Sequence, residues 1–320
     1  MRALSRGAWM VVLALTGCSE VSTIEGDAEP RDAQVRNDGS SVDAAAVDGG
    51  GADAAPPDAP IEIDAGSDAG PPDPCHLDVE IAADCTTASC RQIERRRGSS
   101  ECVTQGYLEY TPPGYGDGSR FPLLVFLHGI GENGDGEGEL INVARSGVPR
   151  LIARDAWALE RPFVVLSPQH FARPDTDCHS TAEIHAMIAY AQRAYDIEPS
   201  RIYLTGLSCG AIGGWNYLGE HTDTQGVAAA VLIAGDGRNA WNRAMCDLGR
   251  VPIWAFHGDA DPRVNVEGTR TPITNLMTMC DPVPDADMVI YPDVTHDSWT
   301  RTYDGSAGHD VYAWLLEHTR

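Results

Sequence analysis

Residues 206–210 read GLSCG, and this stretch decides how the fold is predicted. An apolar run at 202–204 precedes it and small residues at 211–215 follow it, so the pattern predicts a strand, a sharp turn and a helix. Glycine is needed on both sides of Ser208, because the turn is tight and a Cβ would clash there. The turn lifts the Ser208 hydroxyl clear of the backbone and points the following amides toward whatever this hydroxyl attacks.

Two polar residues follow strands further along the chain, in an order that suits a serine nucleophile. An apolar run at 251–256 leads into a loop that contains Asp261, and a second run at 288–291 leads into a loop that contains His296. The order serine, aspartate, histidine is that of an α/β-hydrolase. The sequence therefore predicts Ser208 as the nucleophile, His296 as the general base and acid, and Asp261 as the residue that orients the histidine.

Each partner of Ser208 has rivals in the sequence. Asp259 lies two residues before Asp261 and competes for the same role. Four other histidines are weaker alternatives to His296, since two precede a glycine at a strand end and two belong to the predicted last helix: His128, His257, His309 and His318. The chain contains no lysine, which excludes a serine–lysine dyad and leaves histidine as the base.

Six stretches carry a resemblance to a known group of proteins: LVFLHGIGENGDG (124–136), FVVLSPQ (163–169), DIEPSRIYLTGLSCG (196–210), VPIWAFHGDADPRV (251–264), YPDVTHDSW (291–299) and VYAWLLEH (311–318). Together they resemble the bacterial α/β-hydrolases described as predicted peptidases or phospholipase/carboxylesterase-like serine esterases, related to polyhydroxybutyrate depolymerase-type and feruloyl-type esterases. The resemblance covers residues 106–320 and implies ester hydrolysis without a cofactor. It favours Asp261 over Asp259, because the spacing D-x-x-V of the family matches Asp261 and Val264.

The loop at 128–131 stands where this family has its oxyanion-hole loop. We expect the backbone N–H groups of Cys209 and Ile130 to form the oxyanion hole, with Gly131 as the alternative to Ile130. Two departures from the family pattern are visible: the residues after the serine read CGA where the family usually has MGG, and the loop at 170–178 is unusual. The first leaves the oxyanion amide in place, and the second bears on substrate preference.

The catalytic part of the chain alternates strand and helix signals. We predict strands at 106–110, 122–127, 163–167, 202–206, 228–234, 252–257 and 287–291, and helices at 181–195, 209–220, 272–279 and 309–318. Continuous apolar runs are typical of parallel strands that are buried on both faces. The predicted fold class is therefore α/β, an α/β-hydrolase fold whose mostly parallel, doubly wound sheet has helices on both faces and its site at the carboxyl ends of the strands.

The N-terminal part of the chain is predicted to lie outside this fold. Residues 1–18 combine two arginines, a short apolar run and the ending LTGC, which resembles a lipoprotein signal peptide with Cys18 as the lipidated residue. The alternative is an ordinary secretory signal with an incidental cysteine. Residues 19–74 contain 14 acidic residues and two arginines and predict a disordered, self-repelling linker. A Cys-rich extension at 75–105 precedes the catalytic domain at 106–320.

Charge and anchor together predict where the protein acts. The formal net charge is −24, which argues against nucleic acid as a partner, because phosphate binding needs clustered lysine and arginine. The apolar run before Cys18 is too short to span a bilayer, so the lipid is the expected membrane attachment. Ser19, in place of an aspartate, favours the outer membrane. We expect a protein of the bacterial cell envelope whose catalytic domain is periplasmic or extracellular, in an oligomeric state that the sequence does not specify.

Nine cysteines suit an exported protein. Besides the lipidated Cys18, Cys209 is expected to be a buried free thiol. Four cysteines lie close together and can staple the extension: Cys75, Cys85, Cys90 and Cys102. Cys246 with Cys280 is a candidate bridge, which leaves Cys178 unpaired. Spacing does not determine connectivity, and the odd remainder signals that one of these assignments is wrong.

Other polar residues near the predicted site receive weaker assignments. Glu132, Gln169 and Trp299 are expected to bind substrate, and Glu132 and Gln169 do so by lining the rim of the pocket or else organise its loops. The stretch DTDCH at 175–179 raises a metal hypothesis, but its spacing fits no zinc pattern and it mixes hard and soft ligands. We therefore expect no metal and no cofactor, and a disulfide-tethered loop at this stretch.

The sequence as a whole predicts a serine hydrolase that cleaves carboxylic esters through an acyl-enzyme intermediate. The connections between strands are too short for a large lid, and an open site suits small acyl groups or an ester borne by a polymer such as a polysaccharide. Two alternatives remain open. One is a serine peptidase with the same triad, and the other is a catalytically silent binding module on a hydrolase fold.

Overall fold

The computed structural model describes residues 73–171, 177–222 and 226–320. These residues fall within one unit of the chain, Ser67–Arg320. The predicted signal peptide with Cys18, and nearly all of the acidic linker, lie outside the described residues. None of the helices in the described ranges has the length and the apolar character that crossing a membrane requires.

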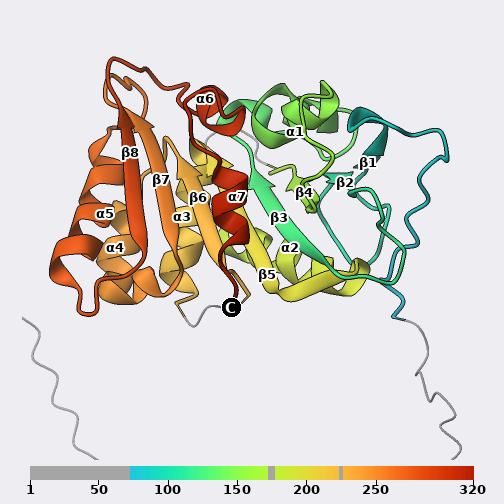
Figure 1. Cartoon of the computed structure of the whole chain (residues 1–320), viewed down its shortest axis with the longest axis horizontal. Helices are drawn as coiled ribbons and strands as arrows, with labels where there is room; N and C mark the ends of the chain where they lie inside the picture. Colours follow the sequence, from blue (N-terminus) through green and yellow to red (C-terminus); the bar gives the residue numbers. More distant parts are fainter. Residues whose placement is uncertain (1–72, 172–176, 223–225) are drawn as a thin grey trace, which may run out of the picture. The chain divides into compact units, whose positions relative to one another are not determined.

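Eight strands form one sheet in the order β1-β2-β4-β3-β5-β6-β7-β8 (Figure 1). The strands are β1 (Gln92–Arg95), β2 (Tyr107–Tyr110), β3 (Phe121–Leu127), β4 (Val164–Pro168), β5 (Ile197–Leu207), β6 (Ala229–Ile233), β7 (Ile253–Gly258) and β8 (Ala286–Tyr291). Neighbouring strands run parallel from β4 to β8, whereas β2 is antiparallel to both β1 and β4. The mostly parallel α/β sheet predicted from the sequence is therefore confirmed.

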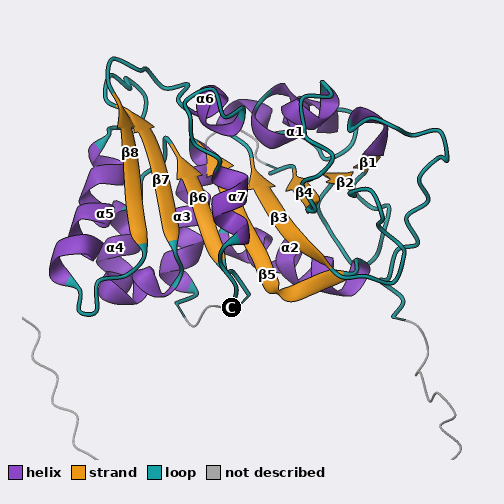
Figure 2. Cartoon of the chain, viewed as in Figure 1, coloured by secondary structure: helices purple, strands orange, loops and turns teal. Residues whose placement is uncertain are grey.

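Helices cover both faces of this sheet (Figure 2). The α-helices are α1 (Gly147–Ala153), α2 (Thr181–Ala194), α3 (Cys209–Glu220), α4 (Arg238–Ala244), α5 (Glu267–Met279), α6 (Trp299–Tyr303) and α7 (Val311–Leu316). Four shorter 3₁₀ helices are η1 (Ser89–Arg91), η2 (Ile130–Glu132), η3 (Leu140–Arg145) and η4 (Met245–Arg250). Buried side chains of α2 to α5 belong to one hydrophobic cluster, and those of α1, α6 and α7 belong to a second cluster.

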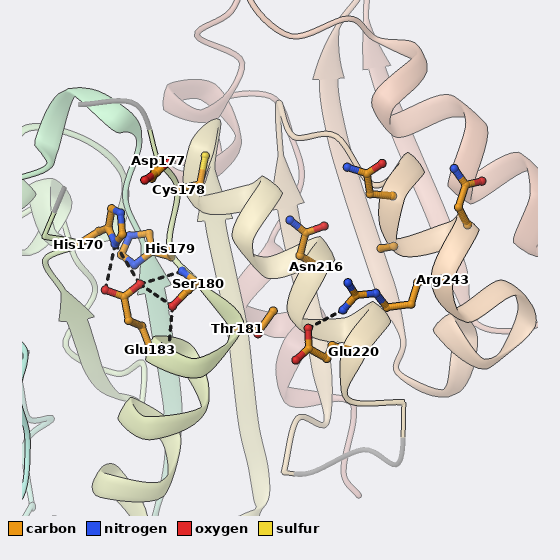
Figure 3. Close-up of a pocket in the computed structure, with 13 residues that line it drawn as sticks. His170, Asp177, Cys178, His179, Ser180, Thr181, Glu183, Asn216, Glu220 and Arg243 are labelled. Carbon is orange, nitrogen blue, oxygen red and sulfur yellow. Dashed lines mark hydrogen bonds and ion pairs between the residues drawn. The ribbon is translucent and has the colours of Figure 1, made fainter. Parts of the chain in front are cut away.

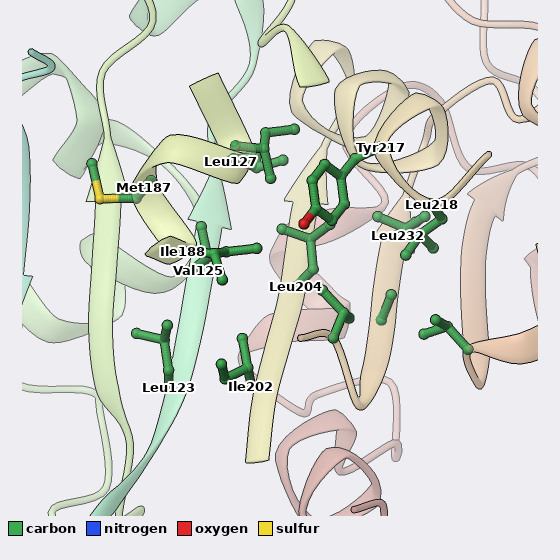
Figure 4. Close-up of a cluster of buried hydrophobic side chains, with 14 of the residues drawn as sticks. Leu123, Val125, Leu127, Met187, Ile188, Ile202, Leu204, Tyr217, Leu218 and Leu232 are labelled. Carbon is green, nitrogen blue, oxygen red and sulfur yellow. The ribbon is translucent and has the colours of Figure 1, made fainter. Parts of the chain in front are cut away.

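Strand β3 shows why the central strands read as continuous apolar runs. All of its seven residues are buried. Leu123, Val125 and Leu127 belong to the cluster under α2 and α3 (Figure 4), whereas Leu124 and Phe126 belong to the cluster on the opposite face. Successive side chains of a strand point to opposite faces of the sheet. When both faces are covered, the side chains on both faces must therefore be apolar. Burying each such side chain contributes about 1.5–3 kcal/mol.

The start of one helix differs from the predicted one, and four short elements were not predicted. Helix α5 begins at Glu267 rather than at 272, with Pro272 inside it. A proline removes one helical hydrogen bond, but the burial of Pro272, Ile273 and Leu276 fixes this segment against the sheet. Strand β1 and the short helices α1, α4 and α6 were not predicted, because four to seven residues give too short a pattern for a periodicity.

The Cys-rich segment contributes the edge strand β1 to the sheet. Two disulfides hold it: Cys75–Cys102 and Cys85–Cys90. Arg95, the last residue of β1, forms a 2.7 Å ion pair with the fully buried carboxylate of Glu109 on β2. The Tyr195 hydroxyl donates to the same carboxylate at 2.6 Å. A buried carboxylate needs such partners, so this ion pair ties β1 to the sheet.

Candidate active site

Ser208 occupies the sharp turn between β5 and α3, with φ of 52° and ψ of −119°. This conformation costs a non-glycine residue about 1–3 kcal/mol and persists only where the surroundings enforce it. Here the backbone N–H of Ser208 donates to the carbonyl of Ile233 at 2.9 Å. A Cβ on Gly210 would lie 2.1 Å from the carbonyl oxygen of Leu127, and a Cβ on Gly206 would lie 2.8 Å from the Gly210 carbonyl carbon. The predicted need for glycine on both sides of the serine is confirmed.

The structure brings together the three residues predicted as a triad. The Ser208 Oγ lies 2.8 Å from Nε2 of His296, and Nδ1 of His296 lies 2.7 Å from Oδ2 of Asp261. The Asp261 side chain is fully buried, whereas 22% of the His296 side chain is exposed. When Nδ1–H donates to Asp261, Nε2 can accept the hydrogen bond of the Ser208 hydroxyl.

Hydrogen bonds keep the carboxylate of Asp261 ionised. The backbone N–H groups of Arg263 and Val264 donate to Oδ1 at 2.8 and 3.1 Å, and Nε2 of His257 lies 3.1 Å from Oδ2. Burial alone would raise the pKa of Asp261. The hydrogen bonds from His296 and from the two backbone amides outweigh this effect, and they lower the pKa below its ordinary value.

Three of the rival residues contact groups away from Ser208. The carboxylate of Asp259 accepts a hydrogen bond from the backbone N–H of Asp293 at 2.7 Å. The ring of His309 packs against aromatic rings of β7, and Nε2 of His318 lies 3.0 Å from the carboxylate of Asp285. These contacts hold all three outside the hydrogen-bonded chain that starts at the serine.

His128 supports the loop after β3 instead of acting near the serine. Its Nδ1–H donates to the carbonyl of Gly129 at 2.7 Å, and its Nε2 accepts the backbone N–H of His170 at 2.9 Å. Burial lowers the pKa of His128 to about 4, so the ring is neutral in the folded protein at pH 7. Both ring nitrogens of His128 therefore form hydrogen bonds with backbone groups.

The residues predicted for the oxyanion hole line the same pocket as Ser208. Cys209 is the first residue of α3, and Ile130 and Gly131 are the first two residues of η2. The first amides of a helix have no acceptor within that helix, so they are available to a developing oxyanion. A Cβ on Gly129 would approach a side-chain atom of Leu207 to 3.0 Å, so glycine lets this loop lie close to the serine turn.

The pocket around Ser208 has a volume of about 800 Å³. Ile130, Ile212 and Trp299 give it an apolar part. The Trp299 ring meets the ring of His296 edge-on, with centroids 5.1 Å apart. Aromatic pairs prefer this arrangement, so Trp299 also fixes the orientation of the histidine.

Glu132 lies in the pocket wall, but its carboxylate is already bonded. It accepts a hydrogen bond from the Ser146 hydroxyl at 2.9 Å. Burial raises the pKa of Glu132 above its ordinary value. The partly buried carboxylate of Glu132 therefore forms part of the pocket wall next to η2.

Of the two roles predicted for Gln169, the structure contradicts substrate binding at the pocket and agrees with the organisation of a loop. Gln169 is buried and lies outside the lining of the Ser208 pocket. Its amide nitrogen donates to the carbonyls of Glu132 and Glu139 at 2.9 and 2.8 Å, and its side-chain oxygen accepts the backbone N–H of Gly136 at 2.8 Å. With its amide group bonded to three backbone groups, Gln169 organises the loop that follows η2.

The cysteine assignments also change. Cys209 is not a free thiol and Cys178 is not unpaired, because the two form a disulfide with their Cα atoms 5.0 Å apart. The bridge Cys246–Cys280 is confirmed. Once Cys18 is set aside, eight cysteines remain, and this even number was the signal for complete pairing. The sulfur of Cys178 is therefore no thiolate ligand, and the described residues contain no group of three or more His, Cys, Asp or Glu placed to hold a metal ion.

Comparison with known proteins adds an independent line of argument. Residues 116–305 match the model of the Phospholipase/Carboxylesterase family, which is more than half of the chain. No curated protein matches the chain.

Solved structures with a similar fold include esterases and a peptidase. A thermostable esterase is 26% identical with a TM-score of 0.51, over 72% of this chain and 63% of that one, so less than two thirds of its length is spanned. The feruloyl esterase module from Clostridium thermocellum, solved with sinapinate, is 16% identical with a TM-score of 0.51, over 71% and 86%. Dipeptidyl peptidase 4 from Porphyromonas gingivalis is 14% identical with a TM-score of 0.51, over 71% and 35%. The last two share the fold alone, and one fold hosts several chemistries.

Proposed function

Since the chain belongs to the phospholipase/carboxylesterase family and is a carboxylic ester hydrolase, we propose that it works through an acyl-enzyme intermediate on Ser208. One observation carries this proposal. The Ser208 hydroxyl, the His296 ring and the Asp261 carboxylate form an unbroken chain of hydrogen bonds of 2.8 and 2.7 Å beside an 800 Å³ pocket.

Each group has one role in the proposed reaction. Oγ of Ser208 attacks the ester carbonyl carbon while Nε2 of His296 takes its proton. The ionised carboxylate of Asp261 stabilises the resulting imidazolium. The backbone N–H groups of Cys209 and Ile130 bind the oxyanion of the tetrahedral intermediate. His296 then protonates the leaving alcohol, and in the second half it activates the water that releases the acid and restores the serine.

The shape of the pocket favours a small acyl group. Its apolar lining includes Ile130, Ile212 and Trp299, and Ile130 itself is 40% exposed. An open apolar pocket of this kind favours a short acyl chain and leaves room for a bulky alcohol at the mouth.

The test is turnover of p-nitrophenyl esters of increasing acyl length. We expect the highest kcat/KM with short acyl chains, and a loss of kcat on the order of 10⁶-fold in Ser208→Ala, as for other triad serines. A fluorophosphonate probe should label the wild-type protein on Ser208. Unchanged turnover in Ser208→Ala would refute the proposed mechanism. Cleavage of peptides without any ester turnover would assign the same residues to a peptidase, and the absence of any label would favour a silent binding module.

We further propose that the lipid on Cys18 anchors the protein to the bacterial cell envelope, with the catalytic unit periplasmic or extracellular. The ending LTGC and the acidic segment at 19–74 support this proposal. Metabolic labelling with palmitate should mark the wild-type protein and not Cys18→Ser. Labelling of both proteins, or of neither, would contradict it.

A further inference from the structure

A second and larger cavity adjoins the Ser208 pocket. Its volume is about 1,030 Å³, against about 800 Å³ for the first, and Cys178 lines both. We call it the α3 groove. Its lining includes residues of α3, of α4 and of the segment that begins α2 (Figure 3): Asn216, Glu220, Asn239, Asn242, Arg243, Thr181 and His179.

The groove follows one face of α3 away from the serine. Asn216 comes seven residues after Cys209 and Glu220 comes four residues after Asn216, so the three lie on one side of the helix. At 1.5 Å per residue, the distance along the axis from Cys209 to Glu220 is about 16 Å. A chain molecule in this groove would therefore lead directly to the site of the proposed reaction.

Two glycines of α3 bring the walls of the groove close. A Cβ on Gly213 would lie 2.7 Å from the carbonyl oxygen of His179 in the segment before α2. A Cβ on Gly219 would lie 2.8 Å from the Cα of Ala240 on α4. Without these glycines neither wall could approach α3 as it does, so the sequence of this helix shapes the groove.

The groove presents hydrogen-bonding groups that have no partner. Within the described ranges, the side-chain amides of Asn216, Asn239 and Asn242 form no hydrogen bond with the protein, and Asn239 and Asn242 are exposed to solvent. Only 3% of His179 is exposed, and neither of its ring nitrogens has a partner among the described residues. Burial holds the pKa of His179 well below its ordinary value, so its ring is neutral. Each of these side chains offers both a donor and an acceptor, which is also what a hydroxyl group offers.

The charges of the groove argue against an anionic ligand, because its lining holds three acidic residues and one arginine. Arg243 is ion-paired with Glu220 across the groove floor. Glu183 is bonded to Nδ1 of His170 and to the hydroxyl of Ser180. A phosphate or carboxylate would find no unpaired arginine here, and an acyl chain would find only the small side chain of Ala240 as an aliphatic surface among the described lining residues.

We propose that the α3 groove binds a neutral carbohydrate chain that carries the ester, so that an acyl group on one of its sugars reaches Ser208. The amide-lined floor bonds the sugar hydroxyls, and His179 closes the end next to the disulfide of Cys178. This inference rests on the proposed function, since it names the alcohol part of the substrate.

Binding is tested separately from turnover. The Ser208→Ala protein is titrated by calorimetry with unsubstituted hexasaccharides of xylose, mannose, glucose and N-acetylglucosamine. We expect at least one to bind, and the double change Asn216→Ala with Asn239→Ala to weaken that binding roughly 5- to 150-fold, as the loss of two hydrogen bonds would. The matched control is Asn275→Ala on α5, which lies in the lining of neither cavity.

Kinetics provides the second readout. The double variant should lower kcat/KM on the acetylated form of the bound hexasaccharide, relative to p-nitrophenyl acetate, by the same factor and mainly through KM. Equal losses on both esters, no hexasaccharide binding, or tighter binding of an uncharged hexapeptide would overturn the inference. If hexasaccharides bind but no ester is cleaved, the carbohydrate site in the groove is supported and the proposed function is refuted.

Discussion

The disulfide between Cys178 and Cys209 offers the sharpest test of how the site is held. The disulfide joins Cys209, the residue directly after Ser208, to the segment before α2. That segment also contacts η2, because the side-chain amide of Asn133 donates to the carbonyl of Asp177 at 3.3 Å. The two amides proposed for the oxyanion hole belong to the two elements that this segment connects. The double change Cys178→Ala with Cys209→Ala removes the link without leaving a free thiol.

The size of the effect follows from the length of the closed loop. The two cysteines are 31 residues apart, and closing a loop of this length in the unfolded chain contributes about 3.7 kcal/mol to stability. For a unit of this size the loss corresponds to a fall in Tm of about 7–15 °C. The matched control is Cys85→Ala with Cys90→Ala, whose separation of 5 residues predicts a loss of about 2 kcal/mol.

Thermal unfolding without reductant, combined with kcat on p-nitrophenyl acetate, measures both consequences. Losing a whole oxyanion donor costs about 100- to 1,000-fold in kcat, so displacing the Cys209 amide should cost about 10-fold or more. The control pair should leave kcat unchanged. Equal falls in Tm for the two pairs would refute the loop argument, and an unchanged kcat in the first pair would refute the proposed brace of the oxyanion hole.

Three further predictions concern single residues. Asp261→Asn should lower kcat on the order of 10⁴-fold, because the histidine loses its orienting anion; a larger loss in Asp259→Asn would reverse the assignment. The ring of His128, whose pKa burial lowers to about 4, should stay neutral at pH 5.5 in an NMR titration. In the unfolded chain the His128 ring has a pKa near 6.5, so it takes up a proton on acidification that the folded ring does not. This difference should lower the free energy of unfolding by about 2.5 kcal/mol as the pH falls from 7.5 to 4.5. A folded-state titration midpoint near 6.5 would contradict the burial argument. Gly210→Ala should cost at least about 3 kcal/mol in denaturant unfolding, because its Cβ would lie 2.1 Å from a carbonyl oxygen, whereas a Cβ on Gly138 meets no atom within 4 Å; equal stability of both variants would show that the turn adapts.

The sequence alone determined seven of the eight strands and the order of the polar loops that follow them. Strands such as β3 are apolar at every position because both faces are covered, and that pattern is visible without coordinates. The turn at Ser208 could likewise be predicted from the local sequence. Its two flanking glycines are required by close contacts that any strand–turn–helix of this kind makes. Asp261 and His296 could be predicted because parallel strands bring their carboxyl ends to one edge.

Only the tertiary structure decided the partners of groups that are distant in sequence. Gln169 read as a pocket residue, yet three backbone groups of a loop more than 29 residues away bond its amide. Cys178 and Cys209 paired because the segment before α2 packs on the glycine face of α3, which no spacing rule encodes. The α3 groove exists for the same reason: its walls come from three elements, and the approach of those elements depends on packing across the whole sheet.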